Sequence, residues 1–210
     1  MRYNLLFGLL AIAFALAAPA CCGLNNTVAS PLENNSTDSQ DEPVDTTGAV
    51  GLADMNELYQ YENSEYDFSV TYPSSWIAED ADENDMGIVA GFLAPGDDMD
   101  NPSTYVTMQV EALPAGMNLT LEQYGQAALS SLKEALPDLQ ILEESDIAIG
   151  QKVGHAIVYD LNSDGMDFKV LKAWMVEGDE AYIMTYNAPA DQYDEFAKDA
   201  STIIGSLVVG

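Results

Sequence analysis

Residues 154–176 read GHAIVYDLNSDGMDFKVLKAWMV, in which two runs of apolar residues flank a short polar segment. The upstream run is rich in Ile, Val and Tyr, and the downstream run has apolar residues two or four positions apart, which is the period of a β-strand. Asn, Asp and Gly between the runs tolerate the left-handed backbone of tight connections. The stretch therefore predicts a β-hairpin whose connection runs from Asn162 to Gly165.

The same connection matches part of a calcium-binding loop. The first, third, fifth and sixth positions of the EF-hand pattern are filled by Asp160, Asn162, Asp164 and Gly165. The last position should supply a bidentate carboxylate, but it is Leu171, and the flanks are predicted strands instead of helices. The hairpin explains every matching residue. The alternative that stays open is a weak divalent-cation site formed by Asp160, Asn162, Asp164 and Asp167.

Residues 1–20, MRYNLLFGLLAIAFALAAPA, have the layout of a secretory signal peptide. Arg2 precedes an apolar stretch from Leu5 to Ala18 that is shorter than the roughly 20 residues needed to span a bilayer. Cys21 follows directly, as in the lipobox of prokaryotic lipoproteins, where the thiol is acylated. We expect a secreted protein anchored at Cys21 to the outer face of the cytoplasmic membrane, and free secretion is the alternative.

Residues 21–58 form an acidic segment dominated by Asn, Ser, Thr, Asp, Glu and Pro, with no hydrophobic period. This composition is typical of a disordered tether. Four N-x-[ST] sequons, three of them in the tether, predict glycan acceptor sites at Asn25, Asn34, Asn35 and Asn118.

Residues 59–210 are predicted to form one α+β domain. Extended segments are expected at 66–72, 87–94, 105–112, 139–149, 152–161, 166–176 and 180–188. The short turns between the last four require those strands to pair antiparallel. Thr120 and Gln123 form a capping box that begins a helix, which must end before Pro137. A second amphipathic helix is expected at about 190–206, and Trp76 is expected in the core.

Several segments of this domain resemble the PsbP family, namely YDFSVTYPSSW, TLEQYGQAAL, the hairpin 154–176, EAYIMTYNAP and YDEFAKDASTIIGSL. The resemblance covers about residues 60–210. It implies an antiparallel β-sheet flanked by helices on both faces, in an α/β/α sandwich. It also implies a generally non-catalytic protein that binds partner proteins, and whose photosynthetic members help to retain calcium and chloride.

The charge balance excludes some partners. Lys and Arg number 6 against 35 Asp and Glu, which gives a formal net charge of −29. Nucleic acid is excluded because its recognition depends on clustered Lys and Arg. Adsorption to anionic lipid is disfavoured, so we expect contact with the membrane through the lipid anchor only.

Few reactive groups are present. The single histidine, His155, lies in a predicted strand on the same face as Ile157 and Tyr159, and we interpret it as a packed or rim residue and not as a general base. Both cysteines precede the domain, so the usual zinc ligand sets are missing. The acidic runs 79–85 and 97–100 are interpreted as solvated loops.

The sequence therefore predicts a non-catalytic, extracytoplasmic PsbP-like module that is monomeric, needs no cofactor and binds a protein or complex of the cell envelope. A second hypothesis is a surface protein that binds calcium or another divalent cation weakly. A third is a hydrolase based on a carboxylate pair, which the abundance of acids leaves open.

Overall fold

The computed structural model describes residues 57–81, 87–97, 101–163 and 165–210. The predicted signal peptide, the lipobox-like cysteine, three of the sequons and one hairpin aspartate lie outside these ranges, that is residues 1–20, Cys21, Asn25, Asn34, Asn35 and Asp164. Within the described ranges, no helix combines the length and the apolar character needed to cross a membrane.

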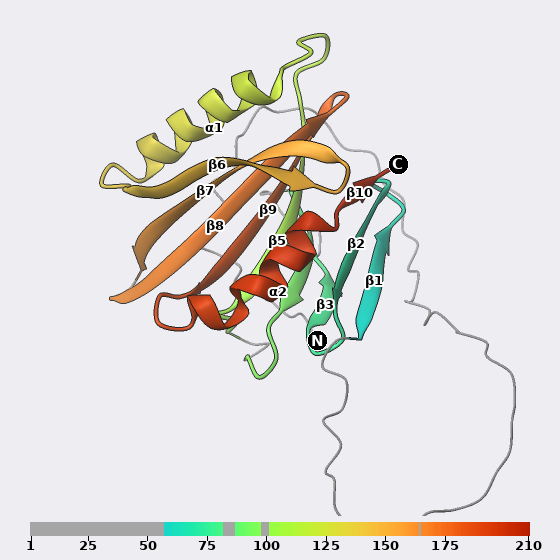
Figure 1. The fold of residues 1–210 in the computed structure, drawn as a ribbon. Coiled ribbons are helices and arrows are strands. Elements are labelled where there is room, and N and C mark those ends of the chain that lie inside the picture. Colours follow the sequence, from blue (N-terminus) through green and yellow to red (C-terminus); the bar gives the residue numbers. More distant parts are fainter. Residues whose placement is uncertain (1–56, 82–86, 98–100, 164) are drawn as a thin grey trace, which may run out of the picture.

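The centre of the fold is a seven-stranded antiparallel sheet with the strand order β3-β4-β5-β9-β8-β7-β6 (Figure 1). Its members are β3 (Ile77–Asp80), β4 (Ile88–Leu93), β5 (Tyr105–Ala112), β6 (Ile141–Ile149), β7 (Lys152–Ser163), β8 (Met166–Glu177) and β9 (Glu180–Pro189). All except β3 coincide with predicted extended segments to within about two residues, because apolar runs bounded by turn residues mark buried strands clearly.

A second sheet has three strands, in the order β1 (Leu58–Asn63), β2 (Phe68–Pro73) and β10 (Val208–Val209). The sequence pattern predicts β2 but neither of its neighbours. Strand β1 carries mostly exposed side chains, so it lacks a buried stripe.

The prediction of a solvated loop from Glu79 onward is wrong at its start, because Glu79 and Asp80 are the last residues of β3 and pair with β4.

One helix covers each face of the large sheet, which confirms the predicted α+β architecture (Figure 1). Helix α1 (Leu121–Ala135) lies over β7 and β8, whereas α2 (Tyr193–Gly205) packs on the opposite face and against β2. The predicted capping box is present: Thr120 Oγ1 accepts a hydrogen bond from the Gln123 N–H at 3.2 Å, and Gln123 Oε1 accepts one from the Thr120 N–H at 3.0 Å.

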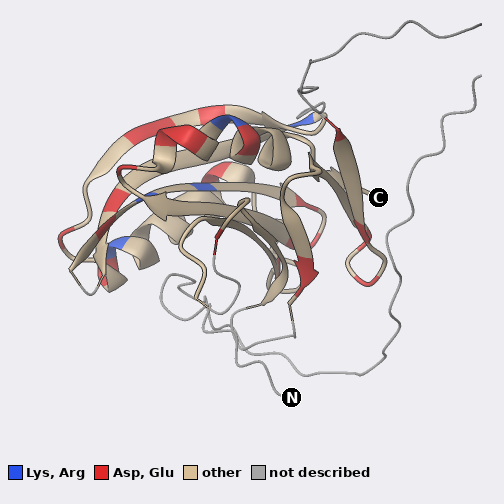
Figure 2. Cartoon of the chain, turned by 90° about the horizontal axis from the view of Figure 1, so that it is seen from below, with Lys and Arg blue, Asp and Glu red and all other residues tan. Residues whose placement is uncertain are grey.

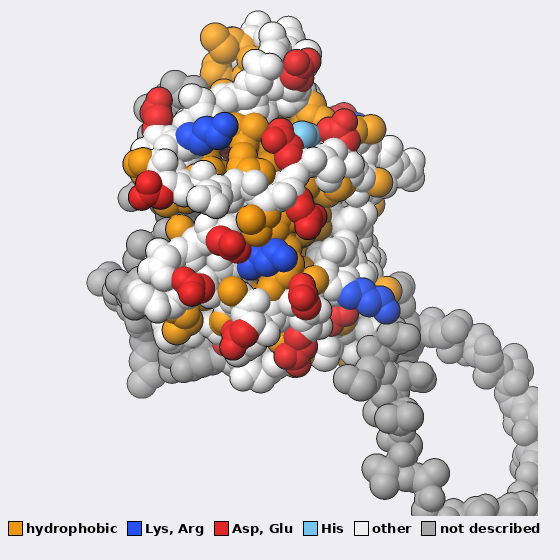
Figure 3. Space-filling view, turned by 60° about the vertical axis from the view of Figure 1, so that its left-hand side comes forward, with side chains coloured by type: hydrophobic (Ala, Val, Ile, Leu, Met, Phe, Trp, Pro, Cys, Tyr) orange, Lys and Arg blue, Asp and Glu red, His pale blue; other side chains and the backbone are white. Residues whose placement is uncertain are grey.

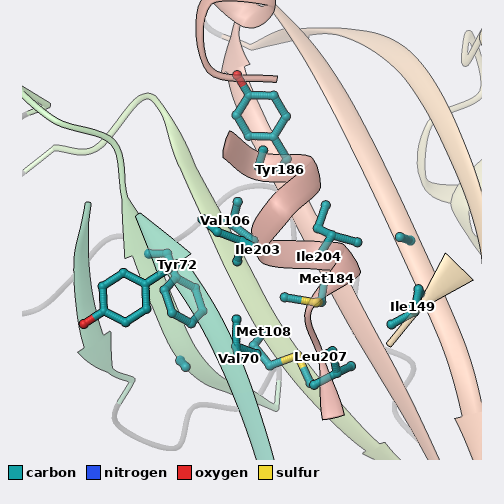
Figure 4. Close-up of a cluster of buried hydrophobic side chains, with 14 of the residues drawn as sticks. Val70, Tyr72, Val106, Met108, Ile149, Met184, Tyr186, Ile203, Ile204 and Leu207 are labelled. Atoms are coloured by element: carbon teal, nitrogen blue, oxygen red, sulfur yellow. The ribbon is translucent and has the colours of Figure 1, made fainter. Parts of the chain in front are cut away.

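The core is divided by the large sheet. The larger part lies between α2, the three-stranded sheet and one sheet face, and Figure 4 shows Ile203 and Ile204 of α2 beside Met184 and Val106 of the strands. Trp76 belongs to it, as predicted, and its Nε1 donates to Asp199 at 3.2 Å. The smaller part lies between α1 and the other sheet face.

The connection between β7 and β8 is shorter than the sequence pattern predicts. Ser163 pairs with Met166, so only residues 164 and 165 lie between the strands. Asn162, predicted to begin the connection, pairs instead with Asp167 within the ladder. Gly165 has a φ of +82°, a left-handed conformation that glycine adopts without strain. The cross-strand pairing therefore extends further than the turn residues indicate.

Candidate functional site

The predicted cation-binding residues that the structure describes lie on one face of the β7–β8 hairpin. Asn162 donates a hydrogen bond from Nδ2 to Asp167 Oδ1 at 2.6 Å. Asp160 lies opposite Lys169 of the neighbouring strand in the β-ladder. The Lys169 ammonium lies 4.6 Å from the centre of the Tyr193 ring. A cation opposite Asp160 competes with a metal ion for that carboxylate. Within the described ranges, no three His, Cys, Asp or Glu side chains are placed to share a metal ion.

His155 is held between two acids of the edge strand β6. Its Nδ1 lies 2.8 Å from Asp146 Oδ1 and its Nε2 lies 3.2 Å from Glu144 Oε1. Its ring packs against Trp174 with centroids 5.2 Å apart. The two ring nitrogens thus face separate carboxylates, an arrangement that ties β6 to β7 at the rim of the sheet. Figure 3 shows the histidine flanked by acidic side chains.

Two further predicted surface features lie in loops. Asn118, in the loop before α1, is exposed and has a φ of 42°, so the sequon is accessible and its glycosylation stays a prediction. Asp97 differs from the solvated acid that the sequence predicts. It accepts hydrogen bonds from the backbone N–H groups of Ser103 and Thr104 at 2.8 and 2.6 Å, and therefore fastens the loop between β4 and β5.

A cleft lies between α1 and the sheet face beneath it. Its lining comes from strands β5, β7, β8 and β9 and from α1, and consists of Gln109, Glu111, Ile157, Lys172, Trp174, Ile183, Tyr124, Ala128, Leu129 and Leu132. The space between these residues is about 430 Å³ when the open mouth is counted, and about 20 Å³ of it can hold the centre of a water molecule. One water needs roughly 10–15 Å³ of such space, so this conformation has room for one or two waters.

The charged residues of the cleft reach it from different strands. Lys172 of β8 pairs with Thr185 of β9, which in turn pairs with Thr107 of β5. Glu111 lies further along β5 on the same face, and its Oε2 accepts a hydrogen bond from the Tyr124 hydroxyl at 2.8 Å. Within the described chain, the ion pairs involve other residues, so Lys172 and Glu111 face the same cleft without contact between their charged atoms.

Burial is the main cause of the shifted pKa values of the titratable groups in the cleft. It lowers the pKa of Lys172 to about 8, although the charge of Glu111 acts in the opposite direction. Burial also raises the pKa of Glu111, against the hydrogen bond from Tyr124 and the charge of Lys172. The pKa of Tyr124 is raised by burial first and then by Glu111. Both charged forms are therefore costly in this place, as is typical of a site of low polarity.

Two buried polar atoms on this face of the sheet, the Tyr159 hydroxyl and Trp174 Nε1, have no hydrogen-bond partner among the residues that the structure describes. Trp174 lines the cleft, and Gly125 of α1 lies above its indole nitrogen. A buried donor without an acceptor costs roughly 1–3 kcal/mol. The sheet side of the cleft thus combines an unpaired N–H with a half-buried amine, which makes the cleft the candidate functional site.

Sequence reasoning missed this cleft, although the sequence holds two signals of it. Alternation in β8 puts Lys172 on the same face as Val170 and Trp174, which is unusual for a lysine. Gly125 stands in the middle of a helix, where alanine would be preferred by about 1 kcal/mol. Each signal is weak alone, and only the fold shows that the two residues lie at one place.

The antiparallel sheet, the helix on each face and the cleft beneath α1 together define a single-domain α+β sandwich. A family model described as "PsbP-like protein" matches residues 26–209. The chain therefore belongs to the PsbP-like protein family, which confirms the resemblance of its motifs. The sequence search of curated proteins gave no significant match.

Solved structures of other proteins share this fold. Cyanobacterial PsbP (CyanoP) from Synechocystis sp. PCC 6803 matches with a TM-score of 0.55 and 16% sequence identity, over 78% of this chain and 99% of that chain. LpqN of Mycobacterium tuberculosis, described as involved in cell envelope biogenesis, matches with a TM-score of 0.50 and 11% identity, over 73% of this chain and 90% of that one. At these identities the similarity concerns the fold.

Acidic side chains dominate the outside of the domain. Figure 2 shows Asp and Glu on strands, helices and turns, whereas Lys occurs at few places. One of these lysines, Lys152, forms an ion pair with Glu177 and so adds little net positive charge. The surface therefore attracts positively charged molecules and repels negatively charged ones.

Proposed function

We propose that this chain is a non-catalytic PsbP-like module that acts outside the cytoplasm and binds another protein or complex of the cell envelope. A lipid at Cys21 holds it to the outer face of the cytoplasmic membrane, and the polar tether carries the domain away from that surface. The observation that carries the proposal is the order of parts in one chain: a signal-like segment, a cysteine, a tether and a PsbP-like domain. The fold shared with LpqN, described as involved in cell envelope biogenesis, supports the setting.

The partner presents a basic surface. The chain has a formal net charge of −29, and complementary charge increases the rate of association and excludes partners of the same sign. Such attraction between exposed charges is screened over about 8–10 Å at physiological salt. Complex formation through this surface therefore weakens as salt is added.

Crosslinking in native membranes tests the proposal. The tagged full chain is crosslinked at low and at high salt, purified and analysed by mass spectrometry. We expect one envelope protein whose crosslinks map to residues 57–210, which is recovered poorly at high salt and which binds the purified chain directly. Recovery of the same proteins by an unrelated chain of equal net charge would contradict specific binding.

The anchor is tested separately. Mass spectrometry of the processed chain is expected to show an acylated Cys21 as the first residue, and replacement of Cys21 by serine is expected to release the protein from the membrane fraction. An unmodified cysteine, or a first residue elsewhere in the chain, contradicts the anchor and leaves the binding proposal standing.

Weak divalent-cation binding is the second candidate function. Asn162 and Asp167 face each other across the hairpin, with Asp160 two residues away on the same face, which gathers oxygen ligands that calcium accepts. Calorimetry with calcium and manganese on the wild type and on an Asp160→Ala, Asp164→Ala variant tests it. Saturable heat that the variant loses would favour this function, and the same heat in both proteins would exclude the hairpin.

A further inference from the structure

The indole of Trp174 provides the first part of the inference. Its side chain is 1% exposed, it lines the cleft under α1, and its Nε1 has no acceptor in the described part of the chain. A Cβ at Gly125 would lie 3.3 Å from Nε1 of this ring, which is closer than most Cβ contacts, and 3.5 Å from Cζ2, which is ordinary contact. Glycine therefore lets α1 lie close above a buried donor, although it weakens the helix.

Opposite charges on the same sheet face provide the second part. Lys172 Nζ has no hydrogen bond or ion pair with any described residue. Glu111 uses Oε2 to accept the Tyr124 hydroxyl, which leaves its other oxygen for a further donor. The cleft thus offers two donors, the Lys172 ammonium and the Trp174 N–H, and one separate acceptor.

The remaining wall is apolar. Leu129 and Leu132 of α1 face Ile157 and Ile183 of the sheet across the cleft. Small-molecule sites commonly combine such a wall with a few convergent polar groups that set the orientation of the ligand.

Charge decides which ligand suits these groups. A simple anion is repelled by a chain of net charge −29 and meets Glu111 in the cleft. A simple cation leaves the two donors without an acceptor. A zwitterion has no net charge, and its anionic and cationic groups can bind the two donors and the Glu111 carboxylate respectively. We propose that the cleft binds a free amino acid with an apolar side chain, with its carboxylate on Lys172 and Trp174, its ammonium on Glu111 and its side chain against the apolar wall.

Binding requires α1 to move outward, because the cleft has room for only one or two waters in this conformation. The helix is suited to this motion. It buries one face only, formed by Tyr124, Gly125, Ala128 and Leu132. The loop before it is exposed, with Gly116 and Asn118 in left-handed conformations. Displacement of α1 opens the smaller part of the core and leaves the larger part, on the opposite face of the sheet, in place.

Titration calorimetry of the full chain with L-leucine tests this inference, with acetate and methylamine as probes of a single charge. The indole N–H resonance of Trp174, one of two tryptophans, reports contact at the site. We expect saturable binding of leucine, a shift of that resonance, and a loss of affinity of about tenfold or more in Gly125→Ala and in Lys172→Met. The matched controls Ser130→Ala, on the exposed side of α1, and Lys198→Met, an exposed lysine of α2, should keep wild-type affinity.

Three results would overturn the inference. Without saturable heat from leucine, the cleft is only a hydrated packing defect. If acetate binds as tightly as leucine, the site recognises anions. If both cleft variants bind leucine like the wild type, binding occurs elsewhere. None of these results affects the proposed envelope partner, which is measured by crosslinking, so the two proposals fail separately.

Discussion

Replacement of Lys172 by methionine is expected to stabilise the protein at neutral pH. The lysine is half-buried under α1, and burial lowers its pKa from 10.5 to about 8. Since each pKa unit corresponds to about 1.4 kcal/mol, keeping the ammonium charged in this place costs about 3 kcal/mol at pH 7. Methionine has a long flexible apolar side chain that fills similar space without that cost.

The attraction between Lys172 and Glu111 is already part of this cost. The charge of Glu111 raises the pKa of Lys172 against the effect of burial, and the value of about 8 is the result of both. We therefore expect a net stabilisation of up to about 3 kcal/mol.

The effect depends on pH with a definite sign. The folded-state pKa of Lys172 lies below its ordinary value, so between about pH 8 and pH 10.5 the unfolded chain binds more protons than the folded chain. The wild type therefore gains stability from this group as pH rises through that range, and below about pH 8 the full cost remains. The advantage of Lys172→Met should shrink accordingly, while the effects of the tyrosines are common to both proteins and cancel in the difference.

Urea unfolding at pH 7 and pH 10 measures this difference. Lys198→Met is the matched control, because it removes the same charge from an exposed position and should change the free energy of unfolding by less than about 0.5 kcal/mol. The reasoning is refuted if Lys172→Met is less stable than the wild type at pH 7, or if its advantage is the same at both values of pH.

Three other changes follow from single contacts. Thr120→Ala removes the cap of α1 and should lower the free energy of unfolding by about 1 kcal/mol in urea, whereas Ser130→Ala in the exposed middle of the same helix should not lower it. Tyr124→Phe removes a hydrogen bond that lowers the pKa of Glu111, so NMR titration should find that pKa higher, and an unchanged value would contradict the contact. Gly150→Ala should destabilise by more than about 2 kcal/mol, because φ is +57° and the added Cβ would lie 2.2 Å from a backbone oxygen.

The sheet and both helices could be predicted because their signals are local. In β7 and β8 runs of apolar residues are bounded by turn residues, and the capping box at Thr120 and Gln123 marks the start of α1 within the sequence itself. Strand β1 could not be predicted in this way. Its residues are mostly exposed, and its place beside β2 is fixed by backbone pairing and by packing of Tyr61 on Phe92, which is distant in the sequence.

The cleft could not be predicted because no local pattern joins its parts. Gly125 and Trp174 lie 49 positions apart in the sequence (174 − 125) and meet only when α1 packs on β8. Conversely, the EF-hand match in the hairpin is local, but it lies in a strand ladder and not between two helices. The Asn162–Asp167 hydrogen bond forms within a strand ladder, where the register of the sheet has placed the two residues opposite each other.

The placement of the lysines bears on how so acidic a chain can select a partner. Lys152 is paired with Glu177, Lys169 lies over the Tyr193 ring, and Lys172 lines the cleft, so these three cations act within the domain. Acids far outnumber the exposed lysines on the outer surface, and such a surface attracts any cation with little discrimination. Charge can therefore speed association with a basic partner, but selection between basic partners requires shape and hydrogen bonding at a specific place. Neutralising scattered surface acids should consequently slow association while leaving partner preference unchanged, and a changed preference would show that the acids themselves are the recognition element.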